Sequence, residues 1–159
     1  MSVEYEHSFK VKNIEDVFKF CDSNGYKKVF ESKQNRIVFE NEYNRNVIAR
    51  LTTTIKDDET NTILDFKNIN TKQGNLNISD ESLPLIVNDE NKQIILSMLN
   101  TMNFQQSADN LRVRTVYEKD SVKFEIDNYI HPVMNVVAIE GEKSEVENVY
   151  KQIEYLIKK

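Results

Sequence analysis

The feature of this sequence that most constrains its fold is a two-residue alternation of apolar and polar side chains. The alternation occurs in seven segments: residues 3–11, 36–42, 47–56, 62–70, 111–117, 122–127 and 134–142. Successive side chains of a β-strand point to opposite faces, so this period predicts strands that each have one apolar face. Few of these strands alternate one-to-one with a helix. We therefore expect a largely antiparallel sheet rather than a parallel, doubly wound one.

Three segments repeat apolar residues at helical spacing instead. The first follows Asn13, which is a good N-cap. The second carries a stripe over residues 94–102, and Asp89 is the expected cap. The last begins at Ser144 and Glu147, which have the spacing of a capping box. The order is thus strand, helix, strand block, helix, strand block and final helix.

Residues 71–88 show neither period. They contain Gly74, Pro84 and many small polar side chains, and we expect a loop there. The fold class predicted from these elements is α+β. A chain of 159 residues suits one domain of common size, so a single domain spanning residues 1–159 is expected.

The second face of several strands is charged. Acidic or basic residues share one face in three pairs: Glu4 with Glu6, Arg112 with Arg114, and Glu125 with Asp127. One interpretation is the solvated side of an open sheet, which is common. The other is a closed sheet whose charged faces turn inward, an arrangement that is costly unless bound ligands complete the pairing. A polyphosphate with Mg²⁺ would do so, because guanidinium groups match phosphate oxygens and carboxylates hold a hard cation.

Six short landmarks follow one another along the chain: Glu4-Tyr5-Glu6, Arg50, Lys67, Arg112-Val113-Arg114, Asp127 and Ile139-Glu140-Gly141. Their order resembles that of the CYTH domains, also called triphosphate tunnel metalloenzymes. That family includes class IV adenylyl cyclases, thiamine triphosphatases and inorganic triphosphatases. The resemblance covers nearly the whole chain and favours the inward-facing interpretation.

The resemblance implies a closed or nearly closed antiparallel β-barrel, a triphosphate tunnel, with helices packed outside. The implied substrate-binding residues are Lys10, Arg50, Lys67, Arg112 and Arg114. The implied ligands of Mg²⁺ or Mn²⁺ are Glu4, Glu6, Asp127 and Glu140, and the implied catalytic residues are Glu4, Glu6 and Lys67. The implied activity is metal-dependent hydrolysis of inorganic triphosphate, thiamine triphosphate or a nucleoside triphosphate.

The sequence departs from the family pattern at three positions. Ser8 stands in place of the signature lysine, Ile48 in place of the first arginine of its pair, and Ala138 in place of the first late glutamate. Lys10 is a candidate substitute for the missing lysine. Two alternatives to hydrolysis therefore stay open. One is a class IV-type adenylyl cyclase, in which a ribose hydroxyl attacks in place of water, and the other is a non-catalytic binder of a nucleotide or polyphosphate.

Composition limits the partners. The net charge of -5 argues against general affinity for nucleic acid or membrane surfaces. The single cysteine, Cys21, excludes an intramolecular disulfide, and no apolar stretch is long enough to span a bilayer, so we expect a cytoplasmic protein.

His7 falls on the apolar face of its strand, where a packed histidine is expected rather than a metal ligand. The expected partner is a small-molecule triphosphate or nucleotide, and a homodimer is one option for assembly.

Overall fold

The computed structural model describes residues 2–74 and 76–157. Its elements are β1 (Ser2–Val11), α1 (Ile14–Ser23), β2 (Lys27–Asn41), β3 (Val47–Lys56), β4 (Glu59–Gln73), β5 (Leu76–Glu81), β6 (Leu85–Val87), α2 (Lys92–Thr101), β7 (Phe104–Lys119), β8 (Val122–His131), β9 (Met134–Gly141), α3 (Lys143–Ile153) and a short 3-10 helix, Glu154–Leu156. Within the described ranges, no helix has the length and apolar character needed to cross a membrane.

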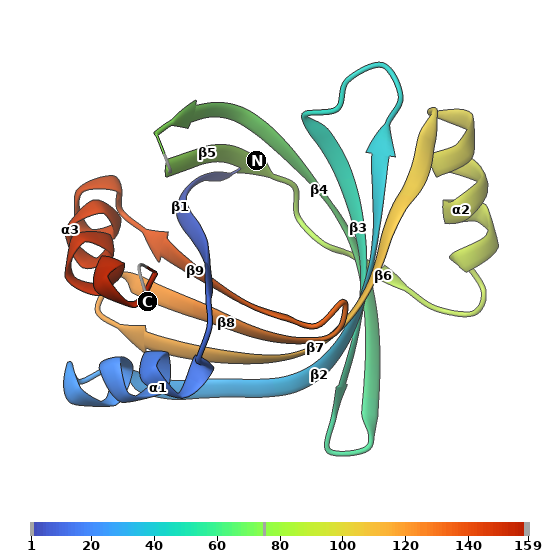
Figure 1. Ribbon diagram of the computed structural model, residues 1–159. Coiled ribbons are helices and arrows are strands. Elements are labelled where there is room, and N and C mark those ends of the chain that lie inside the picture. Colours follow the sequence, from blue (N-terminus) through green and yellow to red (C-terminus); the bar gives the residue numbers. More distant parts are fainter. Residues whose placement is uncertain (1, 75, 158–159) are drawn as a thin grey trace.

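Eight of the described strands close into an antiparallel β-barrel, as the resemblance to the CYTH domains implied (Figure 1). The strands follow the order β3-β2-β7-β8-β9-β1-β5-β4, and β4 pairs back with β3 to complete the ring. Every pairing in the ring is antiparallel. The short strand β6 adds to β4 beside the ring.

The apolar faces of the strands point outward and are covered by helices. In Figure 1, α1 and α3 lie on one side of the barrel and α2 lies on the other. Under α1 and α3, Phe124 and Ile139 pack with helix residues such as Val17 and are fully buried. His7 belongs to this side and stacks on Tyr150 with ring centroids 4.1 Å apart, which confirms the packed histidine.

A second apolar cluster lies under α2. It contains Ile95 and Leu99 of the helix together with Leu51, Leu64 and Phe104 of the strands. Because both cores lie outside the barrel wall, the polar faces of the strands are left to line the interior. The alternation predicts strands with one polar face, and closure of the sheet turns that face into a polar barrel interior.

The expectation of a loop over residues 71–88 is wrong. The strand β4 continues to Gln73, and this stretch also contains β5 and β6. The composition misled the prediction because Asn77, Ser79 and Glu81 are polar. The strand β5 is nevertheless held on both sides by backbone pairing with β1 and β4. A strand whose face turns toward a polar barrel interior does not need the apolar composition of an ordinary strand.

The helix starts were predicted with mixed success. Asn13 is the N-cap of α1, and its side chain accepts a hydrogen bond from the backbone N–H of Glu15 at 3.1 Å. For α2, the cap position is held by Asn91 rather than Asp89. The helix α3 starts at Lys143, so Ser144 lies inside its first turn and the expected capping box does not form.

Candidate functional site

The barrel interior contains a cavity of about 420 Å³. Among the described residues, six basic side chains line it: Arg36, Arg50, Lys67, Arg112, Arg114 and Lys123. Seven carboxylates line it as well: Glu4, Glu6, Asp65, Glu81, Glu125, Asp127 and Glu140. The three charged pairs singled out in the sequence therefore meet in one cavity. The interpretation as a solvent-washed face of an open sheet is wrong, because the sheet closes.

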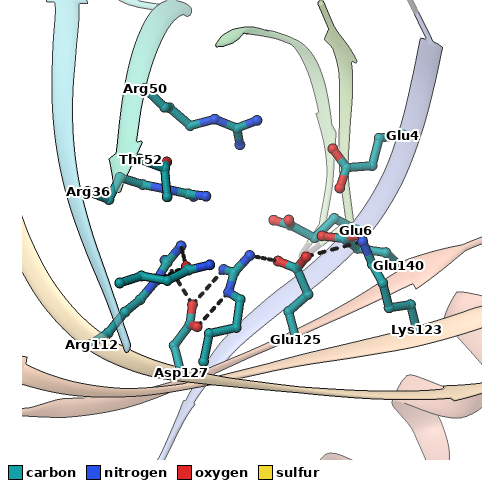
Figure 2. A network of polar contacts seen from close by, with 12 residues as sticks. Glu4, Glu6, Arg36, Arg50, Thr52, Arg112, Lys123, Glu125, Asp127 and Glu140 are labelled. Atoms are coloured by element: carbon teal, nitrogen blue, oxygen red, sulfur yellow. Dashed lines mark hydrogen bonds and ion pairs between the residues drawn. The ribbon is translucent and has the colours of Figure 1, made fainter. Parts of the chain in front are cut away.

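Three of the glutamates, Glu4, Glu6 and Glu140, form an anionic wall across the cavity from the arginines of β2 and β3. Figure 2 shows Arg36 and Arg50, from β2 and β3, on one side and Glu4 on the other. The antiparallel pairing of β2 with β3 and of β1 with β9 places each group on neighbouring strands. A cavity with guanidinium groups on one side and this group of three carboxylates on the other suits an anion that arrives with a metal cation.

Two arginines of the cationic region share one carboxylate. Arg114 donates two hydrogen bonds to Asp127, both at 2.8 Å, and Arg112 donates one at 3.0 Å. Arg114 also forms an ion pair with Glu125. Arg112 is only 1% exposed and donates further hydrogen bonds to Gln34. These pairs hold the guanidinium groups in fixed positions inside the barrel.

Arg50 is also paired. It donates to both carboxylate oxygens of Asp65, at 2.8 and 2.7 Å, and to Glu81 at 2.8 Å. Burial opposes its charge, but the bonds to Asp65 and Glu81 outweigh burial and raise the pKa of Arg50. An incoming phosphate would therefore compete with carboxylates for this guanidinium.

Arg36 differs from the other arginines. Its Nε donates to Oγ1 of Thr52 at 3.0 Å, and within the described chain no carboxylate forms an ion pair with it. Burial and the neighbouring guanidinium groups of Arg112, Arg114 and Arg50 all lower the pKa of Arg36. A guanidinium still stays charged at neutral pH. Arg36 is thus a cation in the cavity that forms no ion pair, and the carboxylate of Glu125 favours its charge only from a distance.

The anionic wall contains a group of carboxylates that could hold a metal ion. One oxygen each from Glu4, Glu6 and Glu140 lies within 4.8 Å of the others. Burial and the neighbouring carboxylates Glu125 and Glu4 raise the pKa of Glu140 to about 9. Carboxylates this close favour a proton or a cation between them, and oxygen ligands are what Mg²⁺ and Mn²⁺ prefer. The residues present therefore fit a divalent metal.

Two lysines neutralise part of this wall. Nζ of Lys67 lies 3.1 Å from Glu4, 3.4 Å from Glu6 and 3.4 Å from Glu81. On the other side, Lys123 lies 2.6 Å from Glu140. The carboxylates are thus already balanced by movable ammonium groups, which can exchange partners when a cation or an anion enters.

The structure does not bring all the predicted site residues together. Asp127, an expected metal ligand, lies among the arginines and outside the group formed by Glu4, Glu6 and Glu140. Lys10 is exposed and does not line the cavity. Lys10 comes two residues after Ser8 and has the same parity on β1 as the lining residues. It is nearer the end of the strand, however, and lies outside the cavity lining.

Sequence reasoning missed several charged residues of the lining as site residues. Arg36 and Lys123 belong to this set, as do Asp65 and Glu81. Lys123 has the same parity as Glu125 and Asp127 on β8, so the period could have identified it. Glu81 could not be found in this way, because its segment was interpreted as a loop.

The sequence matches no known family model and no curated protein. Solved structures do resemble the fold. The PH1012 protein from Pyrococcus horikoshii has a TM-score of 0.75 and 19% identity, covering 97% of this chain and 89% of its own. The candidate adenylyl cyclase HpAC1 from Hippeastrum, with a dominant triphosphatase activity, has a TM-score of 0.66 and 11% identity, covering 94% and 85%.

A chain of the Mediator head module from Schizosaccharomyces pombe also resembles this fold. Its TM-score is 0.66 at 9% identity, covering 98% of this chain and 96% of its own. These identities are low, so the likeness concerns architecture. The chain has the fold of the triphosphate tunnel proteins, and its cavity combines a group of arginines with a carboxylate cluster.

Proposed function

We propose that this protein hydrolyses a triphosphate-containing compound with the help of a divalent metal. The observation that carries the proposal is the facing pair of walls: guanidinium groups on one side and the carboxylates of Glu4, Glu6 and Glu140 on the other (Figure 2). Phosphoryl transfer depends mostly on positioning and on charge neutralisation. Both requirements are met by fixed side chains in a barrel interior.

The basic residues of the cavity bind and orient the phosphates in this proposal. Arg36 is the first contact, because it has no carboxylate to give up. Arg50, Arg112 and Arg114 then bind further phosphate oxygens, either by releasing their carboxylate partners or by bonding a carboxylate and a phosphate at once. Lys67 lies between the acidic wall and Arg50, where it can neutralise charge that develops on the phosphoryl oxygens.

The carboxylates of Glu4, Glu6 and Glu140 would hold Mg²⁺ or Mn²⁺. Such an ion polarises a phosphoryl group and lowers the pKa of a water molecule. The residues of this chain fix where the phosphates lie relative to those carboxylates. Asp127 contributes by holding Arg112 and Arg114 in place.

The direct test is phosphate release from inorganic triphosphate, thiamine triphosphate and ATP, with and without Mg²⁺ or Mn²⁺. Metal-dependent release that is lost in Glu4→Gln and Glu6→Gln is the expected result. Product chromatography with ATP separates a hydrolase from a cyclase, because only a cyclase forms the cyclic nucleotide and pyrophosphate. Absence of turnover with every substrate and metal would overturn the enzymatic proposal.

A binding role without turnover is the second candidate. It is favoured by the ion pairs that already occupy Arg50, Arg112 and Arg114, and by the neutral residues at Ser8, Ile48 and Ala138. In that case triphosphate would raise the melting temperature by mass action without being cleaved. A thermal shift without phosphate release identifies this outcome.

A further inference from the structure

The lining of the cavity changes from charged to neutral at one end of the barrel. Six residues form this neutral collar: Val38, Ile48, Ile69, Asn110, Tyr129 and Val136. All six are only partly buried, so their side chains retain surface that faces the open space. Four of the six are aliphatic, which is an unusual lining for a cavity that otherwise presents thirteen charged groups.

The barrel topology puts the collar residues at the same end. Val38 comes two residues after Arg36 on β2. On β3, which runs the opposite way, Ile48 comes two residues before Arg50. The other members lie after the charged lining residues on β4 and β8 and before them on β7 and β9. Neighbouring strands run in opposite directions throughout the ring. A residue that follows the charged residues on one strand therefore lies at the same end of the barrel as a residue that precedes them on the next strand.

The three departures from the CYTH pattern fall at this same end. Ile48 is a member of the collar itself. Ser8 comes two residues after Glu6 on β1, and it pairs directly with Ala138, which comes two residues before Glu140 on β9. Both also line the cavity. The charges that the resemblance would lead one to expect are therefore absent from one region rather than lost at scattered positions.

The chemistry of the collar suits an uncharged, flat organic group. Aliphatic side chains offer no hydrogen-bond donors to a phosphate, and the burial of a charged phosphate without donors is costly in free energy. The ring of Tyr129 is held in place, because its hydroxyl accepts a hydrogen bond from Arg112 at 3.0 Å. Such a ring can stack on a flat partner. The side chain of Asn35 donates a hydrogen bond to the backbone carbonyl of Asn110. Among the described residues, none forms a hydrogen bond with the side-chain amide of Asn110, which leaves that amide able to bond a polar ring atom.

We propose that the collar binds the organic group of a triphosphate ester, and that the substrate is a nucleoside triphosphate rather than inorganic triphosphate. This inference rests on the proposed binding of phosphates by the charged part of the cavity. The phosphates occupy the zone between Arg36 and the carboxylates, and the base lies among the collar residues. The neutral end then selects against a longer chain of phosphates, which would have to place charge there.

Calorimetric titration in the presence of Mg²⁺ tests this with three probes: ATP, methyl triphosphate and inorganic triphosphate. Methyl triphosphate carries the same esterified phosphate chain as ATP but lacks the nucleoside. ATP should bind at least about tenfold more tightly than methyl triphosphate, equivalent to about 1.4 kcal/mol. Ile48→Arg should reduce that ratio and strengthen the binding of inorganic triphosphate. The matched control is Ile55→Arg, at an exposed isoleucine of the same strand that does not line the cavity, and it should change neither.

The outcomes separate the two proposals. If the three probes bind equally and Arg36→Met weakens all of them alike, the cavity binds phosphate and the collar proposal is overturned alone. If none of the probes binds, both proposals fail. If ATP binds preferentially but Ile48→Arg leaves the ratio unchanged in a protein with native circular dichroism, the nucleoside lies elsewhere and the collar proposal again fails. Tyr129→Ala, measured in the same way, provides a second variant should Ile48→Arg not fold.

Discussion

Arg36 donates a hydrogen bond to the hydroxyl oxygen of Thr52, and the guanidinium groups of Arg112, Arg114 and Arg50 lower its pKa. This relationship separates Arg36 from Arg114, whose guanidinium forms ion pairs with both Glu125 and Asp127. A buried arginine without an ion-pair partner costs free energy in the ligand-free protein, whereas removal of an arginine from a buried pair costs free energy because it leaves a carboxylate without a partner. The two residues should therefore respond in opposite ways to the same substitution.

Arg36→Met should preserve or raise the melting temperature of the ligand-free protein while it weakens triphosphate binding by about 10- to 100-fold, the usual loss for a charge-assisted hydrogen bond. The matched variant Arg114→Met should destabilise the fold by about 3–5 kcal/mol, because it leaves buried carboxylates without a partner. Differential scanning calorimetry and titration with inorganic triphosphate measure the two effects. A stability loss for Arg36→Met as large as that for Arg114→Met would contradict the assignment of Arg36 as an unpaired cation.

The carboxylate cluster makes a prediction about metal removal. Chelation of divalent ions should leave the fold intact, since Lys67 and Lys123 balance the carboxylates, but it should abolish phosphate release and shrink the thermal shift caused by triphosphate. Glu140→Gln should have the same effect in the presence of saturating Mg²⁺. The exposed residue Glu142 supplies the control, and Glu142→Gln should behave as the wild type. A full thermal shift in Glu140→Gln would show that the metal is held elsewhere.

Much of the barrel could be predicted from the sequence because each strand carries its own period. The register of Ser8 with Ala138, in contrast, depends on which strands become neighbours around the ring. Asp127 illustrates the limit for the site. Its strand and inward face follow from the alternation, but its carboxylate lies against Arg112 and Arg114 because β7 and β8 are paired with Arg114 opposite Asp127. The alternation within a single strand does not reveal which strands pair. The sequence therefore could not tell whether Asp127 binds a metal ion or holds the two arginines in position.

Glu125 should give the protein a distinctive response to acid. Burial opposes ionisation of this carboxyl, but Arg114 and Lys123 outweigh burial and lower its pKa from 4.5 to about 2. A carboxyl with a depressed pKa stabilises the fold at pH values above the unfolded pKa, and this contribution is lost as the pH falls through the folded pKa. The melting temperature of the wild type should therefore exceed that of Glu125→Gln by about 5 °C above pH 5, and the gap should close toward pH 2. A gap that stays constant over this range would contradict the assignment.

Lys10 makes a simpler prediction. Its side chain is exposed and lies outside the cavity lining, so Lys10→Ala should change triphosphate affinity by no more than about twofold. Lys67→Ala, within the cavity, should weaken binding and lower the rate of phosphate release, because it removes an ammonium group from the boundary between the two walls. Titration at two salt concentrations measures both variants. A large loss of affinity in Lys10→Ala would mean that the strand end closes over the ligand.

Restoring the family pattern tests whether turnover is limited by the missing charges. Ser8 and Ala138 are paired partners on β1 and β9, one step from the carboxylates of Glu6 and Glu140. Ser8→Lys with Ala138→Glu would add a cation for phosphate and a carboxylate beside the proposed metal ligands Glu6 and Glu140, and the two new side chains could pair with each other in the ligand-free state. The double variant should gain metal-dependent phosphate release from inorganic triphosphate and lose preference for ATP, while Ser8→Met with Ala138→Gln should gain nothing. If the wild type is inert and the double variant remains inert although it folds and binds triphosphate, the protein is a binder rather than a degenerate enzyme.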